Sequence, residues 1–243
     1  MVGAMGLLFL VRHAQASFLD ENYDKLSELG EAQARLLGEY WARRKMVFDR
    51  ACVGPCVRQK DTAKVVSDAY RKAGLKFPET AVLSEFDEYQ AEAVLKQSLS
   101  GLLESDHGIR DLNAVFESSV DLAARRASFQ KLFEVVVGKW VSGETRMHGV
   151  ETWPEFCSRV NSGLTKFLSA GGHRERVAIF TSGGPIAVAM QRALRLSRES
   201  TLQASWMSRN SSWSEFLYSA GRFTLSTFNS DGHIDDPAML TYR

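Results

Sequence analysis

The sequence is poor in cysteine and has no long hydrophobic run. Its three cysteines, Cys52, Cys56 and Cys157, form an odd set whose spacing matches no zinc motif. This pattern argues against a disulfide framework, and it predicts reduced thiols, no bound metal and a cytoplasmic location. The apolar stretch near the N-terminus is too short to span a membrane, and no basic region precedes it. We therefore expect neither a signal peptide nor a membrane helix.

A large charge of one sign is also absent. The 243 residues have a formal net charge of +1 at pH 7, which does not favour nucleic acid or an acidic surface as the partner. Hydrophobic residues make up 44% of the chain and charged residues 24%, as in ordinary globular proteins. Internal repeats, low-complexity tracts and clear linkers are missing as well. A single domain over residues 1–243 is therefore the expectation.

Segments typical of strands and of helices alternate along the chain. Short apolar runs predict strands at residues 7–11, 50–54, 80–83, 176–181, 214–218 and 222–228. Helical periodicity predicts helices at residues 27–44, 57–74, 152–170 and 186–194, with a further short one after Ser197. Alternation of this kind predicts a three-layer α/β/α sandwich with a mostly parallel sheet.

Residues 90–150 interrupt this alternation, because they contain helical patterns and no clear strand. Apolar residues at helical spacing predict one amphipathic helix near residues 94–103 and another at residues 122–140. The capping box of Thr152 and Glu155 then begins the next helix. We expect the block to be a helical insertion near the site that sets specificity. Nothing in it identifies a substrate or an oligomeric state.

A cation and an imidazole follow the first apolar run. Arg12 and His13 stand at the end of the strand predicted at residues 7–11, where α/β folds bind ligands. A neutral imidazole held by a hydrogen bond can act as a nucleophile. An adjacent arginine binds phosphate oxygens through its planar fork and lowers the pKa of the ring. Taken alone, the pair is better explained as a strand-end histidine bonded to the backbone beside an exposed arginine, because the dipeptide is common.

Arg58 favours the phosphate interpretation, because it begins the helix that follows the second strand. It therefore also lies at the carboxyl end of a strand, and two arginines at neighbouring strand ends would form a clamp for a dianion. The alternative for Arg58 is a solvated helix arginine, as Lys60 and Lys64 beside it are expected to be.

Several segments, taken in order, resemble the histidine phosphatase superfamily, the phosphoglycerate-mutase-like proteins. They are residues 10–14 (LVRHA), 26–34 (LSELGEAQA), 58–63 (RQKDTA), 83–85 (LSE), 183–186 (GGPI) and 229–233. Each motif is weak alone, but the set is specific and covers most of the chain outside the helical insertion. The resemblance implies the phosphatase fold of that superfamily and no cofactor.

The resemblance also implies a reaction and a set of site residues. His13 would attack phosphorus and hold the phosphoryl group, while Arg12 and Arg58 would stabilise its charge. Glu85 would be the general acid for the leaving oxygen. Asp87 and Glu88 compete closely for that role, and all three carboxylates could instead form a solvated loop. Positions that often hold phosphate or shape its loop correspond to Gln15, Ser17 and Asn22.

Two residues depart from the family's pattern. Ala14 replaces a glycine, which is a mild change, whereas Ser182 replaces a second histidine that donates to the phosphoryl oxygens. A serine hydroxyl donates one hydrogen bond but has no positive charge, and losing such a donor costs about a hundred- to a thousand-fold in rate. The backbone N–H groups of Gly183 and Gly184, at a helix N-terminus, remain an anion-binding site. His148 is the expected substitute donor.

Three functions follow from these residues. The first is a phosphomonoester phosphatase, slow or rescued by another donor, acting on a small phosphorylated substrate or a phosphoprotein. The acidic segment disfavours a mutase, because it departs from the mutase pattern after its glutamate. The second is a catalytically impaired phosphate- or phosphoprotein-binding module. The remote third is a serine hydrolase that combines Ser182 with Glu215 or Asp231 and His233, although Phe180 occupies the position where a nucleophile elbow needs glycine.

Overall fold

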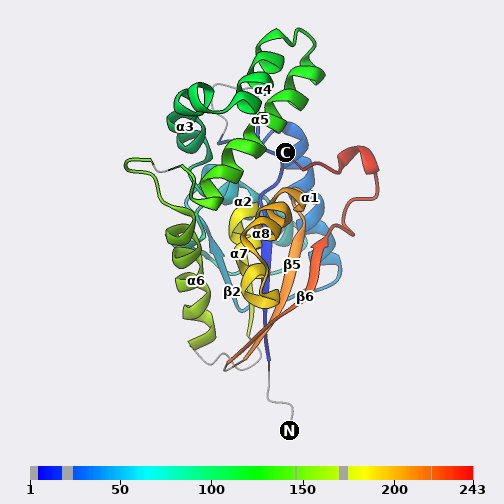
Figure 1. Ribbon diagram of the computed structural model, residues 1–243. Helices are drawn as coiled ribbons and strands as arrows, with labels where there is room; N and C mark the ends of the chain where they lie inside the picture. Colours follow the sequence, from blue (N-terminus) through cyan, green and yellow to red (C-terminus); the bar gives the residue numbers. More distant parts are fainter. Residues whose placement is uncertain (1–4, 18–23, 146, 170–174, 220, 243) are drawn as a thin grey trace. The chain divides into compact units, whose positions relative to one another are not determined.

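A computed structural model describes residues 5–17, 24–145, 147–169, 175–219 and 221–242. The chain divides into two compact units. The first comprises Met1–Glu88 and Ser158–Arg243, and the second comprises Tyr89–Cys157. Figure 1 shows that the first unit contains the sheet and that the second is built from helices. The second unit begins and ends close to the expected insertion, residues 90–150.

The first unit is organised around a six-stranded sheet with the order β3-β2-β4-β1-β5-β6. The strands are β1 (Gly6–Arg12), β2 (Arg50–Val53), β3 (Thr80–Val82), β4 (Arg176–Thr181), β5 (Trp213–Ser219) and β6 (Arg222–Ser230). The first four are parallel to one another, and β5 and β6 form an antiparallel hairpin at one edge. The predicted mostly parallel sheet is therefore confirmed.

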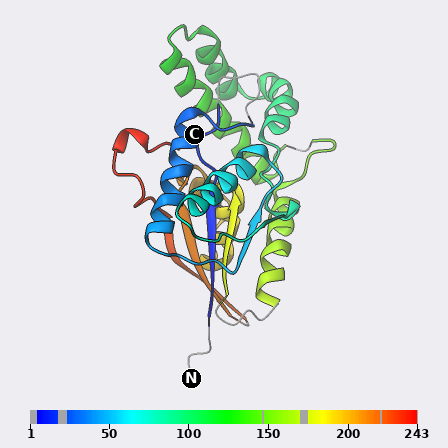
Figure 2. The same ribbon diagram turned by 180° about the vertical axis from the view of Figure 1, so that it is seen from behind.

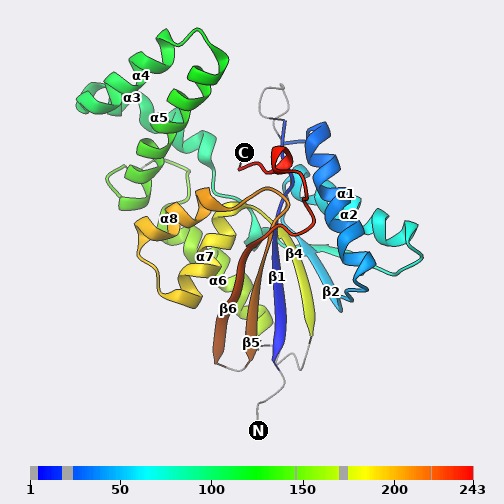
Figure 3. The same cartoon turned by 90° about the vertical axis from the view of Figure 1, so that its right-hand side faces the viewer.

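Helices cover both faces of this sheet, as seen from front, back and side in Figures 1, 2 and 3. One face is covered by α1 (Glu28–Arg43) and α2 (Val57–Lys72). The other is covered by α6 (Trp153–Ser169), α7 (Gly183–Leu194) and α8 (Arg198–Met207). The expected three-layer arrangement is thus confirmed, and α1 begins where Ser27 accepts a hydrogen bond from the Gly30 N–H at 3.0 Å.

The central strand β1 is apolar on both faces because helices cover both. Leu8 and Leu10 alternate with Phe9 and Val11, and all four side chains are buried. Phe9 and Val11 belong to the core cluster that includes Trp41 of α1. A polar residue at the end of β1 is therefore held by a rigid, closely packed strand.

The second unit contains α3 (Ala91–Ser105), α4 (His107–Ser118), α5 (Leu122–Ser142) and the first residues of α6. The sequence predicted two helices before α6, which correspond to α3 and α5. The helix α4 between them is an additional one. It begins at Asp106, whose side chain accepts a hydrogen bond from the Ile109 N–H at 3.2 Å. In this unit Tyr89 stacks on Trp140 with ring centroids 5.1 Å apart. Across the described chain, no helix has the length and apolar character needed to cross a bilayer.

Candidate active site

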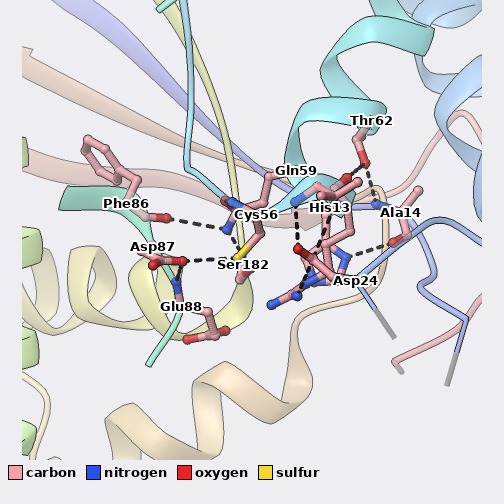
Figure 4. Close-up of polar contacts among 12 residues, drawn as sticks. His13, Ala14, Asp24, Cys56, Gln59, Thr62, Phe86, Asp87, Glu88 and Ser182 are labelled. Carbon is pink, nitrogen blue, oxygen red and sulfur yellow. Dashed lines mark hydrogen bonds and ion pairs between the residues drawn. The ribbon is translucent and has the colours of Figure 1, made fainter. Parts of the chain in front are cut away.

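His13 follows β1 and is 5% exposed. Its backbone N–H donates to the Thr181 carbonyl at 2.8 Å, which places it beside the end of β4. Its ring Nδ1 lies 2.8 Å from the Ala14 carbonyl, and its Nε2 lies 3.1 Å from Arg58 Nε (Figure 4). Because a guanidinium can only donate, Nε2 is the acceptor and Nδ1 bears the proton. The lone pair of Nε2 thus faces Arg58.

The ring of His13 is neutral at neutral pH. Burial lowers its pKa well below 6.5, and the positive charges of Arg58 and then Arg12 lower it further. The hydrogen bond to the Ala14 carbonyl acts in the opposite direction and is the smallest of these contributions. A neutral imidazole with a lone pair on Nε2 is the form that can act as a nucleophile.

Both expected arginines lie at the site and are largely buried. Arg12 Nη1 donates to the Ser208 carbonyl. Arg58 Nη1 donates to Asp24 Oδ1 at 2.7 Å, and Asp24 also accepts the Val57 N–H at 2.8 Å. The Asp24 carboxylate therefore has two roles, since it caps the first turn of α2 and also orients Arg58. The sequence reasoning did not select Asp24, because it lies 34 residues away from Arg58 in a polar loop.

Ser182 follows β4 at the N-cap position of α7 and is 1% exposed. Its Oγ lies 2.8 Å from Gln59 Nε2 (Figure 4). Gln59 is fully buried, and its Oε1 accepts the Cys56 N–H at 3.1 Å. Gln59 is a second residue that the sequence reasoning missed, since nothing in its local pattern connects it to a serine 123 positions away.

The three carboxylates of the acidic loop, Glu85, Asp87 and Glu88, bind different partners. Glu85 forms an ion pair with Lys166 of α6, and this hydrogen bond is the main reason that its pKa is lowered. Asp87 Oδ1 accepts a hydrogen bond from Cys56 Sγ at 3.1 Å. Glu88 Oε2 accepts the Gly184 N–H at 3.1 Å, which places this carboxylate at the N-terminus of α7, next to Ser182. Asp87 and Glu88 therefore join the polar network of Figure 4, whereas Glu85 turns to α6.

Cys56 also lies in this network, with its thiol directed at Asp87. Burial is the main reason that the pKa of Cys56 is raised to about 12. The thiol therefore stays protonated at neutral pH and acts as the donor of the bond to Asp87.

Two of the three residues expected to hold phosphate or shape its loop, Gln15 and Ser17, make hydrogen bonds from the loop after β1. Gln15 Oε1 accepts from the Ser27 hydroxyl at 2.8 Å, and Ser17 Oγ donates to the Leu26 carbonyl at 3.2 Å. Both side chains thus tie the loop after β1 to the segment before α1. Asn22 lies outside the described residues.

Gly183 begins α7, where a side chain would not fit. A Cβ atom there would lie 2.7 Å from the Ser205 carbonyl of α8, so glycine permits the close approach of the two helices. His148, the expected substitute donor, is an exposed residue of the second unit. Its role therefore stays a prediction. Over the described parts of the chain, no three His, Cys, Asp or Glu side chains gather as a metal-binding group.

The segment that precedes β5 holds the backbone of His13 by hydrogen bonds. Asn210 Nδ2 donates to the His13 carbonyl at 3.1 Å, and the Ser211 N–H donates to the same oxygen at 3.3 Å. Ser211 Oγ in turn lies 2.8 Å from Nε2 of buried His233. His233 is therefore paired with Ser211, and Ser182 with Gln59. This arrangement does not form the triad that a hydrolase based on Ser182 would require.

Three solved structures share the fold of this chain. A structure from Escherichia coli str. K-12, described as an alpha-ribazole-5'-P phosphatase, has 16% sequence identity and a TM-score of 0.64 over 93% of this chain and 97% of that chain. Phosphoserine phosphatase from Entamoeba histolytica has 16% identity and a TM-score of 0.61 over 94% and 99%. Phosphoglycerate mutase from Bacillus anthracis str. Sterne has 15% identity and a TM-score of 0.58 over 95% and 96%.

At these identities the three structures establish a shared fold. A search of curated protein sequences finds no match to this chain. The model of the histidine phosphatase superfamily (branch 1) matches residues 8–129 and 121–231, a span that includes His13, both arginines and Ser182. The chain therefore belongs to the histidine phosphatase superfamily, branch 1.

Proposed function

We propose that the protein is a phosphatase that hydrolyses phosphomonoesters through a phosphohistidine formed on Nε2 of His13. The observation that supports this most is the state of the imidazole. It is buried and neutral, it donates through Nδ1 to the Ala14 carbonyl, and it directs Nε2 at Arg58. A second supporting feature is the presence of two largely buried guanidinium groups beside it. Phosphoryl transfer depends mainly on positioning and on such charge stabilisation.

In the first step, Nε2 of His13 attacks phosphorus, and the bond between phosphorus and the leaving oxygen breaks. The ring keeps its proton on Nδ1, where the Ala14 carbonyl stabilises the positive charge that develops on the imidazole. Arg58 turns its N–H groups from Nε2 to the phosphoryl oxygens, and Arg12 completes the clamp. The leaving oxygen takes a proton from a carboxylic acid.

We assign that acid to Glu88 in place of Glu85. Glu88 lies at the N-terminus of α7, next to Ser182, whereas the Glu85 carboxylate is bound by Lys166. The ion pair lowers the pKa of Glu85, so this carboxyl is a poor proton donor at neutral pH. Asp87 is the second candidate, but its Oδ1 accepts two hydrogen bonds, from the Cys56 thiol and from the Glu88 N–H, whereas Glu88 accepts one from Gly184.

In the second step, water attacks the phosphohistidine. The Glu88 carboxylate takes a proton from this water, the bond between phosphorus and Nε2 breaks, and inorganic phosphate leaves. His13 returns to the neutral form, and Glu88 is again protonated. All groups needed for the cycle come from the chain and the water.

A catalytically impaired phosphate-binding module is the second candidate, and one observation favours it. By the resemblance, Ser182 would take the place of a histidine of the family, and its hydroxyl is neutral. The ligand of either function is a small phosphorylated compound or a phosphoprotein, and no nucleic acid partner is proposed. We further propose a cytoplasmic location and one catalytic domain in which the unit of residues 89–157 is an insertion that sets specificity.

Trapping of the intermediate tests the proposal. The protein is incubated briefly with a phosphomonoester labelled on phosphorus and is then quenched. We expect label that resists alkali and is lost in acid, and we expect none in the His13→Ala variant. Labelled phosphate that remains bound without covalent label or turnover would instead identify the impaired binding module.

A further inference from the structure

We propose that Gln59 is a positioning residue that fixes the hydroxyl of Ser182 as a hydrogen-bond donor to the phosphoryl group. The inference rests on the proposed function, because it needs a phosphoryl group on or beside His13. It follows from three features of the site. These are the orientation of the Gln59 amide, the direction of its bond to Ser182, and the position of Ser182 in the sheet.

Two backbone groups fix the orientation of the Gln59 amide. Its Oε1 accepts the Cys56 N–H at 3.1 Å, and its Nε2 lies 3.5 Å from the Phe86 carbonyl (Figure 4). A flipped amide would set its oxygen against the Phe86 carbonyl and its NH₂ against the Cys56 N–H. Both contacts would be repulsive, so Nε2 must be the atom that faces Ser182.

This orientation determines the role of the Ser182 hydroxyl. Gln59 Nε2 donates to Ser182 Oγ at 2.8 Å, so the oxygen acts as the acceptor of that bond. The single hydrogen of the hydroxyl remains for another partner. Within the described part of the structure, no acceptor for this hydrogen is found, and Ser182 is too buried for bulk water to supply one.

The sheet places Ser182 and the nucleophile at corresponding positions just after two neighbouring strands. Arg12 at the end of β1 pairs in register with Thr181 at the end of β4. The next residues along the two parallel strands are His13 and Ser182, and the His13 N–H donates to the Thr181 carbonyl at 2.8 Å. A phosphoryl group bound at His13 therefore lies on the side of the sheet edge where Ser182 stands, and it supplies the missing acceptor.

Gln59 is closely packed by its neighbours. A Cβ atom on Gly54, which follows β2, would lie 2.2 Å from Gln59 Oε1. Glycine at this position thus makes room for the amide. Since the side chain is also fully buried, Gln59 loses no further conformational freedom when the phosphoryl group arrives, and the donor is pre-organised.

The Gln59→Glu substitution tests the direction of the bond, because it keeps the shape of the side chain. When ionised, the introduced carboxylate accepts the Ser182 hydrogen and withdraws it from the phosphoryl group. When protonated, it can donate to Ser182 as the amide does. We expect kcat to fall about 10- to 100-fold at high pH and to recover as the pH falls, since a hydrogen bond to a charged group is lost.

The Ser182→Ala variant supplies the reference. It should be slowed by a similar factor and should lack the new pH dependence. In the Ser182→Ala background, Gln59→Glu should cause no further loss of kcat, because the hydroxyl on which Gln59 acts is gone. Gln203→Glu, an exposed change on α8 that adds the same charge, should match the parent protein.

Independent losses in the double variant, or a Gln59→Glu profile parallel to that of the parent, would overturn the positioning role. Thermal unfolding identifies variants that fail to fold. If Gln59→Glu fails, Gln59→Met serves in its place, with a loss of kcat that does not vary with pH and that again vanishes in the Ser182→Ala background.

Binding of inorganic phosphate, followed by calorimetry, separates this inference from the proposed function. If the parent protein binds phosphate but does not turn over substrate, the proposed function fails alone. The positioning role still predicts weaker phosphate binding by Gln59→Glu at high pH and by Ser182→Ala. Equal phosphate affinity in all variants would defeat the positioning role alone, and absence of both phosphate binding and turnover in the parent would defeat both.

Discussion

The identity of the general acid can be tested with Glu→Gln substitutions at positions 88 and 85, which replace one carboxylate oxygen by an amide nitrogen. In Glu88→Gln, the side-chain oxygen can still accept the Gly184 N–H, which lies 3.1 Å from Oε2 in the parent protein. The local structure should therefore persist while the transferable proton is lost. General acid catalysis contributes about 10²- to 10⁴-fold, so kcat for an alkyl phosphate should fall by a factor in that range.

The leaving group provides the control within the same variant. A p-nitrophenolate can leave without being protonated, whereas an alkoxide must take a proton to leave. The loss in Glu88→Gln should therefore be large with an alkyl phosphate and small with p-nitrophenyl phosphate. Steady-state kinetics with a series of esters would show rates that depend more steeply on leaving-group pKa than in the parent protein.

Glu85→Gln is the matched comparison. This change breaks the ion pair with Lys166, whose side chain is 58% exposed, so the loss of stability should stay below about 1 kcal/mol. Activity should change little with any ester. A loss that depends on the leaving group in Glu85→Gln, and not in Glu88→Gln, would refute the assignment and return the role to Glu85.

Three further predictions concern Arg58, His233 and Gly183. Arg58→Lys should lower kcat about 100-fold in steady-state assays, because an ammonium cannot replace the rigid fork that reaches both His13 and Asp24. Burial lowers the pKa of His233 to about 4 from 6.5, so the unfolded chain binds its proton more readily between these values. The free energy of unfolding should therefore fall by up to about 3 kcal/mol as the pH drops from 6.5 to 4, and urea titrations should show a flatter profile for His233→Asn. Gly183→Ala should destabilise the protein by about 1–3 kcal/mol in thermal unfolding, because the added methyl group meets the Ser205 carbonyl of α8 at 2.7 Å.

Much of the fold could be predicted because it depends on local patterns. The apolar run that ends at Arg12 becomes β1, and the capping box at Thr152 begins α6, with its N–H donating to Glu155 at 2.8 Å. Such signals need only neighbours a few positions away. The helix α4 was missed because its block has helical character throughout, and only the Asp106 cap divides it from α3.

The sequence by itself determined that His13 follows a buried strand, that Arg58 begins the next helix after a strand, and that Ser182 precedes a helix at a third strand end. These placements follow from local burial and periodicity, together with the ordered motifs of the superfamily. Only the tertiary structure decided which side chains meet. Glu88 lies 96 positions from its partner Gly184, and Gln59 lies 123 positions from Ser182. Partners so distant are chosen by the strand order and by packing between layers, and no local pattern records them.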